Sequence, residues 1–296
     1  WDLLPIDKYR NTIHFSMTNN NERSPFTSIY TSLGCPYKCD FCCINAPFGK
    51  STFRYWRPEF IIKEFDKIAK LGIKNIKIAD EMFVLNKNHF LKICDLLIDR
   101  QYNFNIAAYA RVDTVREEYL EKLKKAGFNW LSLGIESGNR KVRIDSTKGR
   151  FEEVDVKDIV NKIQSYDIDV MNNFMFGMSG DTHETMQETL DLAIELNSSG
   201  ANFNPTMIFP GSPLFTELYN KGHQLPKTYS AYSYYSKDSF PNPTKDLSRR
   251  DILKFRDEAF NKYFDRKEWF DKIYKRFGNE SVDIYKKILM SKIERK

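Results

Sequence analysis

Four of the five cysteines lie within nine consecutive positions, and their spacing suits a metal centre. Three of them follow the pattern Cys35-x3-Cys39-x2-Cys42, directly after a predicted strand that ends at Gly34. Three thiolates on one loop can bind three irons of a cubane iron–sulfur cluster, and the fourth iron then has no protein ligand. An open coordination position of this kind is what chemistry at a cluster requires.

A structural zinc site, with Cys43 as the fourth thiolate, is the alternative. Closed zinc sites usually combine two well-separated pairs of ligands, and the sequence offers no second pair. Cys94 stands alone on the apolar face of a predicted helix, where we expect a core thiol. We expect Cys43 to be a buried neighbour of the loop, with a redox or substrate-facing role as the alternative.

Short apolar runs alternate with amphipathic stretches after the first cysteine. The runs predict six strands, at residues 27–33, 73–79, 104–108, 130–135, 170–176 and 202–209. The stretches between them predict helices at residues 58–71, 89–101, 116–126, 154–165 and 185–197. This alternation predicts an α/β fold with a parallel sheet and right-handed crossovers.

Polar and glycine residues follow several of the predicted strands. They are Asp80-Glu81, Arg111, Glu136-Ser137-Gly138 and the stretch Gly177 to Gly180. The carboxyl ends of parallel strands meet at one edge of a barrel or open sheet, where active sites form. These residues are therefore expected to converge with the cysteines on one rim.

The chain divides into three predicted parts. Residues 1–26 are an N-terminal linker or extension, residues 27–225 are the core, and residues 226–296 are an irregular segment followed by helices that pack on the core. The Tyr-, Ser- and Pro-rich residues 226–245 are expected to cover part of the rim. Because the chain begins with Trp1 instead of Met, we expect it to be the C-terminal part of a longer product.

The composition is that of a folded protein without a nucleic-acid-binding character. The 296 residues are 41% hydrophobic, and 46 Lys and Arg against 40 Asp and Glu give a net charge of +6. The charges of both signs are interleaved, which is typical of solvated helix faces. No apolar run approaches the roughly 18 residues of a membrane span, and no signal peptide is evident. We therefore expect a cytoplasmic protein without a membrane span or a nucleic-acid partner.

The stretch Cys35-Pro36-Tyr37-Lys38-Cys39-Asp40-Phe41-Cys42 resembles the CxxxCxΦC hallmark of the radical S-adenosylmethionine (SAM) superfamily, where Φ is aromatic. The later stretches ADEMF, YARVD, LGIESGN, MFGMSGDTHET and FPGSPLF are similar, in order, to the branch that often carries an N-terminal cobalamin-binding domain. The resemblance runs from about residue 27 to residue 220. It implies a partial (β/α)6 TIM-like barrel of parallel strands with a C-terminal helical extension.

The resemblance also implies a cofactor set. Cys35, Cys39 and Cys42 would bind a 4Fe-4S cluster, whose free iron would chelate the amino and carboxylate groups of SAM. Reductive cleavage of SAM would then give methionine and a 5′-deoxyadenosyl radical that abstracts hydrogen from substrate. A reductant such as flavodoxin or ferredoxin and a small-molecule substrate are the implied partners.

The same resemblance assigns contacts to SAM. Phe41 would lie against the adenine, and either Asp80 or Glu81 would meet the methionine amino group. Arg111 would face the methionine carboxylate. For single residues, ordinary roles stay open: Glu81 as a helix N-terminal charge and Arg111 as a surface ion pair.

Two further strand ends complete the implied SAM site. Glu136 and Ser137 would approach the ribose or methionine portion, and Gly177 to Gly180 would leave room for the adenosine. A turn residue is the alternative interpretation of Glu136.

The sequence departs from the branch at cobalamin. The branch uses a DxHxxG loop, whereas the DxH of this chain, Asp181-Thr182-His183, lacks the glycine. We therefore expect His183 to be an ordinary loop residue. Cobalamin would bind only if a domain preceding Trp1 supplied its site, since 296 residues leave no room for one beside the core.

The leading functional hypothesis is a radical SAM enzyme that methylates an unactivated carbon. A cobalamin-free rearrangement, cyclisation or oxidation is the alternative reaction, and a non-enzymatic iron–sulfur or zinc-binding protein is the alternative class. Methylthiolation is disfavoured because the cysteine and nucleic-acid modules of that class are not visible. We expect substrate contacts from residues 43–57, residues 229–235 and the C-terminal helices.

Overall fold

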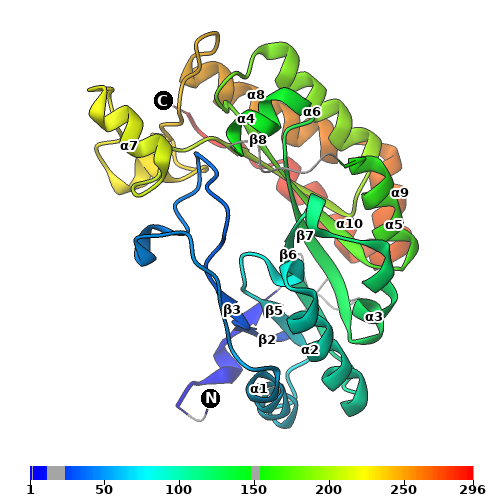
Figure 1. Cartoon of the computed structure of the whole chain (residues 1–296). Helices are drawn as coiled ribbons and strands as arrows, with labels where there is room; N and C mark the ends of the chain where they lie inside the picture. The colour runs from blue at the N-terminus through cyan, green and yellow to red at the C-terminus, as the bar shows by residue number, and fades with distance from the viewer. Residues whose placement is uncertain (2, 12–23, 148–153, 296) are drawn as a thin grey trace.

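The computed structural model describes residues 1, 3–11, 24–147 and 154–295, and within them one curled sheet organises the chain. The sheet has seven strands in the order β1-β2-β5-β6-β7-β8-β9. Strand β1 (Arg10–Asn11) pairs antiparallel at one edge. The six others are parallel to one another: β2 (Ser24–Ile29), β5 (Asn75–Ile78), β6 (Asn105–Arg111), β7 (Phe128–Glu136), β8 (Asp169–Phe176) and β9 (Gly200–Pro205). Figure 1 shows that they curl into a half-barrel, which confirms the predicted fold class.

Helices cover the convex side of this half-barrel (Figure 1). Those that connect the strands are α1 (Pro58–Lys70), α2 (Lys87–Arg100), α3 (Leu120–Lys125), α5 (Val156–Ser165) and α6 (His183–Leu196). The C-terminal helices are α8 (Arg249–Phe264), α9 (Lys267–Phe277) and α10 (Asn279–Leu289), and α8 contacts β9. The five connecting helices were predicted to within a few residues, apart from the first turn of the third, which is a 3-10 turn at Glu117–Tyr119. The C-terminal helices were predicted only as helices that follow the irregular segment.

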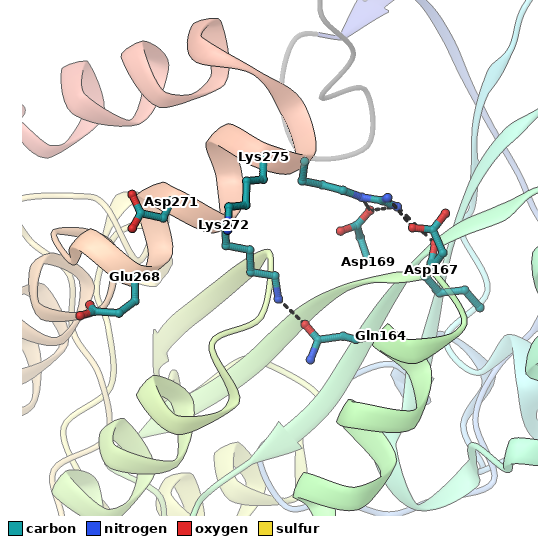
Figure 2. Close-up of a pocket in the computed structure, with 9 residues that line it drawn as sticks. Gln164, Asp167, Asp169, Glu268, Asp271, Lys272 and Lys275 are labelled. Atoms are coloured by element: carbon teal, nitrogen blue, oxygen red, sulfur yellow. Dashed lines mark hydrogen bonds and ion pairs between the residues drawn. The ribbon is translucent and has the colours of Figure 1, made fainter.

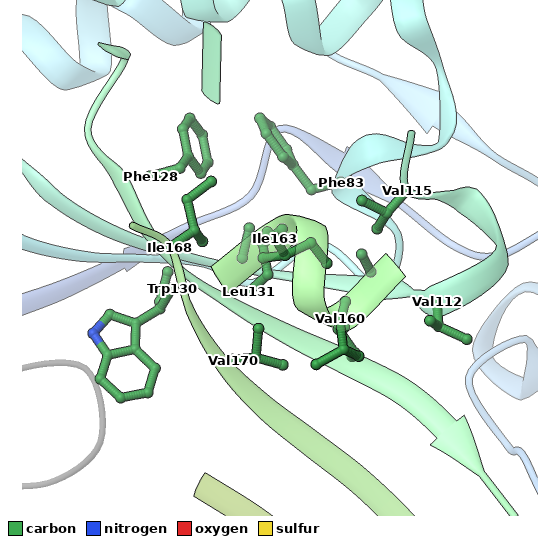
Figure 3. Close-up of a cluster of buried hydrophobic side chains, with 14 of the residues drawn as sticks. Phe83, Val112, Val115, Phe128, Trp130, Leu131, Val160, Ile163, Ile168 and Val170 are labelled. Atoms are coloured by element: carbon green, nitrogen blue, oxygen red, sulfur yellow. The ribbon is translucent and has the colours of Figure 1, made fainter. Parts of the chain in front are cut away.

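Local sequence explains why these elements form. Pro58 occupies the first turn of α1, where no hydrogen bond needs its missing N–H, and Gly72 with φ of +71° follows the helix end. Most residues of β6, β7 and β8 are buried, because helices cover one face of these strands and the other face lines the interior. Figure 3 shows the result between sheet and α5, where Val160 and Ile163 lie among buried side chains that include Leu131 and Val170.

Some elements differ from the sequence-based expectation. The predicted strand at 27–33 is two strands, because β2 ends at Ile29 and β3 (Ser32–Leu33) instead pairs antiparallel with β4 (Arg54–Tyr55). Helices α4 (Arg140–Ser146) and α7 (Pro213–Asn220) lie in stretches for which no helix was predicted. The predicted strand at 202–209 ends at Pro205.

His183 is the first residue of α6, so its interpretation as a loop residue was wrong. Thr182 caps that helix, and Asp181 accepts hydrogen bonds from Met178 N (2.9 Å) and Thr185 Oγ1 (2.7 Å). The DTHET stretch therefore serves to begin a helix.

Residues 2 and 12–23 of the predicted N-terminal extension lie outside the described residues. Where the structure describes the chain, none of its helices combines the length and the apolar character that crossing a membrane requires.

Candidate active site

The three clustered cysteines lie on a long excursion between β3 and α1, residues 34–57, which is called the cysteine loop below. One pocket of about 390 Å³ is lined by Cys35, Cys39 and Cys42. Other residues of the loop, together with Gly211 and Pro213, complete its lining. Gly34 opens the loop with φ of +90°, and a Cβ atom there would lie 2.2 Å from the carbonyl oxygen of Thr52. Only glycine fits this position, which explains why one precedes the first cysteine.

Asn45 braces the cysteine loop from within. Its Oδ1 accepts a hydrogen bond from Cys35 N (3.3 Å), and its Nδ2 donates to the Tyr37 carbonyl (3.0 Å) and to Ser51 Oγ (3.3 Å). One side chain thus ties the start of the cysteine motif to its middle and to Ser51, in the part of the loop that leads to β4. Asn45 was not predicted as a site residue, since its only signal in the sequence is its place in the loop.

Three distant elements support the loop from outside. Glu81, after β5, accepts a hydrogen bond from Gly34 N (3.1 Å). Asp40 N donates to the carbonyl of Ser146 in α4 (3.1 Å), and the Asp40 carbonyl accepts from Leu214 N in α7 (2.9 Å). Figure 1 shows the loop crossing the open side of the half-barrel towards α7. The two helices that were not predicted therefore help to hold the cysteine motif.

The environment of the thiols opposes their ionisation. Burial, together with the negative charge of Glu136, raises the pKa of Cys39 to about 12, and burial raises the pKa of Cys42 to about 11. The thiols therefore need a cation before they can act as thiolates, so metal binding must release protons.

The donor set fits a cluster better than a single ion. Among the described residues, no three His, Cys, Asp or Glu side chains converge on a position that would hold one metal ion. A cubane cluster takes each thiolate on a different iron, so its three ligands need to surround one pocket but not to meet at one point. The cysteines on the 390 Å³ pocket meet that requirement.

Asp80 and Glu81 have different surroundings. The Asp80 carboxylate is buried and accepts three hydrogen bonds, from Thr31 N (2.6 Å), Thr31 Oγ1 (2.5 Å) and Ser32 Oγ (2.5 Å). These bonds hold the bend between β2 and β3, which is why one predicted strand becomes two. Glu81 is only partly buried and reaches the cysteine loop through Gly34. Burial raises the pKa of its carboxyl group above the ordinary value.

Arg111, the last residue of β6, is 6% exposed, so its interpretation as a surface ion pair was wrong. Its Nε and Nη2 donate to the two carboxylate oxygens of Asp113, at 2.6 and 2.5 Å. The guanidinium also lies over the ring of Tyr37, 3.6 Å from its centre. The stretch YARVD thus supplies both partners of a buried ion pair next to the cysteine motif, and the sequence analysis singled out only the arginine.

Glu136 ends β7 in a left-handed conformation with φ of +69°, where the register between β7 and β8 shifts. For a residue other than glycine this conformation is uncommon and is often found at functional sites. Burial raises the pKa of Glu136 to about 7, against the effect of the Arg111 charge. Its charge acts on Cys39 and Cys42. The residue therefore lies close to the thiols, as its strand end predicted.

The contacts of Ser137 and Gly177 support the fold. Ser137 is fully buried, and its hydroxyl lies 3.2 Å from Thr189 Oγ1 and accepts a hydrogen bond from Asn139 N (3.1 Å). Gly177 has φ of +78°, and a Cβ there would lie 2.6 Å from Ile252 Cδ1 in α8. Close packing of α8 and backbone conformation account for this glycine. A role of either residue towards SAM stays a prediction.

The remaining predicted positions are those of Phe41, Cys43 and Cys94. Phe41 is partly buried between Cys39 and Cys42, and Cys43 is partly buried beside them. Cys94 is fully buried in α2, which confirms it as a core thiol.

Tyr234, in the Tyr-rich segment of residues 226–245, is partly buried beside the chain that leads to Gly211 and Pro213 of the cysteine pocket. Its ring packs edge-on against Phe209 at 6.1 Å between centroids. Burial and the charge of Glu136 raise the pKa of its phenol to about 12. The composition of this stretch predicts a cover of the rim but does not single out Tyr234.

Another pocket, of about 600 Å³, lies at the opposite end of the sheet and is drawn in Figure 2. It opens beside Asp169, the first residue of β8, whose carboxylate accepts from Arg276 Nε (2.9 Å). Lys272 of α9 donates to the carbonyl of Asn197 (2.7 Å). These contacts attach α9 to the amino-terminal end of the sheet, the end that in barrel folds serves stability more often than chemistry.

Comparison with known proteins agrees with this geometry. The family model described as the radical SAM superfamily matches residues 29–193. The chain is 27% identical over 219 residues to an uncharacterized methyltransferase of Pyrococcus horikoshii, an alignment that covers 73% of this chain and 44% of that protein. It is also 27% identical over 241 residues to the anaerobic magnesium-protoporphyrin IX monomethyl ester cyclase of Cereibacter sphaeroides, covering 78% of this chain and 37% of the cyclase.

A similar solved structure is that of the radical SAM methyltransferase TsrM from Kitasatospora setae with cobalamin and a 4Fe-4S cluster bound. The TM-score is 0.61 at 22% identity, and the match covers 69% of this chain and 42% of that one. At this identity the likeness shows the fold. The chain spans less than half the length of each of these three proteins.

Proposed function

Because the chain belongs to the radical SAM superfamily, we propose that it is the catalytic core of an enzyme that cleaves SAM reductively and abstracts hydrogen from a substrate. The observation that carries this proposal is the pocket that Cys35, Cys39 and Cys42 line at the carboxyl edge of the half-barrel. The charged side chains of Glu81, Arg111 and Glu136 reach the same edge from three neighbouring strands.

Cys35, Cys39 and Cys42 would hold a 4Fe-4S cluster through one thiolate each. When bound, the cluster supplies one electron to the sulfonium of SAM, which gives methionine and a 5′-deoxyadenosyl radical. Around it, Asn45 and Gly34 maintain the shape of the loop, and the Tyr-rich segment excludes water. Exclusion of water matters because a carbon radical would otherwise react with solvent or with other hydrogen donors.

Glu81 is the better candidate of the two adjacent carboxylates for the methionine amino group. The oxygens of Asp80 are already occupied by Thr31 and Ser32, whereas Glu81 is partly exposed and contacts the cysteine loop. Arg111 would provide positive charge for the methionine carboxylate, and Asp113 and Tyr37 hold its guanidinium in place. Charge-assisted hydrogen bonds of this kind orient a zwitterion firmly.

The other SAM contacts follow the family resemblance. Phe41 would lie against the adenine, and Glu136 and Ser137 would approach the ribose or methionine portion. Gly177 would border the adenosine. Of these, Glu136 has the strongest support, since it combines a left-handed backbone with a charge close to the thiols.

Methyl transfer to carbon is the favoured reaction, because relatives include methyltransferases. Oxidative cyclisation is the second candidate, supported by the similarity to the magnesium-protoporphyrin ester cyclase. We propose residues 27–225 as the radical SAM core. A cobalamin-dependent reaction would need a cobalamin site outside these residues. A cytoplasmic location, a flavodoxin- or ferredoxin-type reductant and a small-molecule substrate complete the proposal.

Anaerobic reconstitution with iron and sulfide, followed by dithionite and SAM, tests the proposal. We expect absorbance near 400 nm from thiolate-to-iron charge transfer, and formation of 5′-deoxyadenosine and methionine. Cys39→Ala should lose both signals, and Cys43→Ala is the matched control that should keep the absorbance. If a fully reconstituted wild-type chain formed no 5′-deoxyadenosine, the proposed enzymatic activity would be contradicted. An unchanged spectrum in Cys39→Ala would contradict the assignment of Cys39 as a cluster ligand.

A further inference from the structure

The Tyr-rich segment is tied to the C-terminal tail. Arg295 Nη1 donates hydrogen bonds to the carbonyl oxygens of Tyr234 and Ser236, both at 3.0 Å. These two residues belong to the turn that carries the Tyr234 ring against Phe209. In Figure 1 the red tail correspondingly ends beside the yellow-to-orange segment. A residue 61 positions away along the chain thus determines where this turn lies.

The other side of the Arg295 guanidinium is held by α8. Its Nε and Nη2 donate to Asp257 Oδ2 and Oδ1, each at 2.9 Å. Arg256 donates to the same carboxylate (2.8 Å) and to the carbonyl of Phe203 in β9 (2.8 Å). Although burial opposes ionisation, the two arginines keep the pKa of Asp257 below its ordinary value. A continuous polar chain therefore runs from the sheet to the segment above the site.

The tail has little apolar packing of its own. Met290 is 80% exposed, and the next two residues are exposed as well. A cavity of about 570 Å³ separates the tail from α8 and is lined in part by Tyr235, Asp257 and Lys292. In contrast, the Arg295 side chain is 17% exposed. The planar fork of arginine can donate to a carboxylate and to carbonyls at once, which an ammonium cannot do with the same geometry.

We propose that Arg295 is a positioning residue that holds the Tyr-rich segment closed against Phe209, beside the part of the cysteine pocket that Gly211 and Pro213 line. This inference rests on the proposed function, in which the segment shields a radical from solvent. The rings of Tyr232 and Tyr234, which both pack on Phe209, agree with a closed arrangement. Release of Arg295 should open the segment without disturbing the half-barrel.

Hydrogen exchange of the full apo chain tests the closure independently of any cluster. In Arg295→Ala we expect amides of residues 229–240 to exchange about tenfold faster, while those of β6 to β8 stay unchanged. Lys292→Ala, a neighbouring cation of the same tail, is the matched control and should behave as wild type. Arg295→Lys should lie between the two, because it keeps the charge next to Asp257 and loses the fork.

A second measurement follows iron extraction from the reconstituted chain by a chromogenic chelator. Arg295→Ala should lose iron about threefold faster than Lys292→Ala, because the cysteine loop becomes more accessible. Asp257→Asn serves as a second variant if Arg295→Ala fails to fold, and should show the same two changes. Exchange in residues 229–240 equal to that of Lys292→Ala would overturn the proposal. Failure of the wild type to bind iron would count against the proposed function instead, since the exchange experiment does not depend on it.

Discussion

The guanidinium of Arg111 lies 3.6 Å from the centre of the Tyr37 ring, and Tyr37 stands between the first two cysteines of the motif. The contact joins the end of the central strand β6 to the cysteine loop. Because Asp113 binds the same guanidinium through two hydrogen bonds, the position of the charge is determined on two sides. The cysteine motif is therefore coupled to the sheet through an arginine that also bears on SAM in the proposed function.

Arg111→Ala should destabilise the chain by about 3–5 kcal/mol, because it removes a buried ion pair and two hydrogen bonds to the Asp113 carboxylate. The measurement is the free energy of unfolding from urea titration of the apo chain. Lys87→Ala removes the exposed pair with Glu118 and should cost at most about 1 kcal/mol. Equal losses in the two variants would contradict a structural role of the Arg111–Asp113 pair.

Asp80→Asn should reduce the free energy of unfolding by about 2–3 kcal/mol, since an amide cannot accept three hydrogen bonds from Thr31 and Ser32 as a carboxylate does. The loss should appear in urea titration of the apo chain. If the variant were as stable as wild type, the bend between β2 and β3 would not depend on this carboxylate.

Glu81→Gln should instead act on ligand binding. The amide oxygen can still accept from Gly34 N, so we expect a change in unfolding free energy below about 1 kcal/mol. The affinity for SAM should fall by about tenfold or more, because a charge-assisted bond to the methionine amino group is replaced by a neutral one. Equilibrium binding of SAM to the reconstituted chain measures this. An unchanged affinity for SAM would show that Glu81 does not bind the methionine amino group.

Gly177→Ala should destabilise the chain more than Gly180→Ala does. Both glycines have positive φ, at +78° and +89°, so both substitutions cost about 1–2 kcal/mol of backbone strain. At Gly177 the new Cβ would also collide with Ile252, whereas nothing lies within 4 Å of it at Gly180. We expect an extra loss of about 1–3 kcal/mol for Gly177→Ala. Recovery of part of it by Ile252→Val would identify the collision as the cause.

The raised pKa of Glu136 predicts a pH dependence of the apo chain. Burial brings this pKa to about 7 in the folded state, above the ordinary value of about 4.3 for an unfolded glutamate. Between these values the folded state binds more protons, so the contribution of Glu136 to stability falls as pH rises from about 4.3 to 7. Glu136→Gln should therefore gain stability relative to wild type across this range. A difference that is constant with pH would show that Glu136 titrates normally.

The helices and parallel strands were predictable because hydrophobic periodicity is a local property of the chain. The short pieces were not. Helix α4 is only Arg140–Ser146, and β3 and β4 have two residues each, which is too short for a periodic signal. Their existence depends on partners elsewhere, such as the Asp80 carboxylate that bends the chain at Thr31, 49 positions away.

By itself the sequence determined the parallel α/β fold, the three cysteines on one loop and the strand ends that carry Glu81, Arg111 and Glu136. Spacing and alternation are sufficient for these conclusions, since parallel strands bring their carboxyl ends to one edge. Only the tertiary structure decided that the Asp80 carboxylate already accepts hydrogen bonds from Thr31 and Ser32. It also decided that Asp113 and Tyr37 hold Arg111, and that Arg295 contacts the segment of Tyr234. The physical reason is that hydrogen bonds and ion pairs depend on distances of a few ångströms between residues far apart along the chain, which no local pattern encodes.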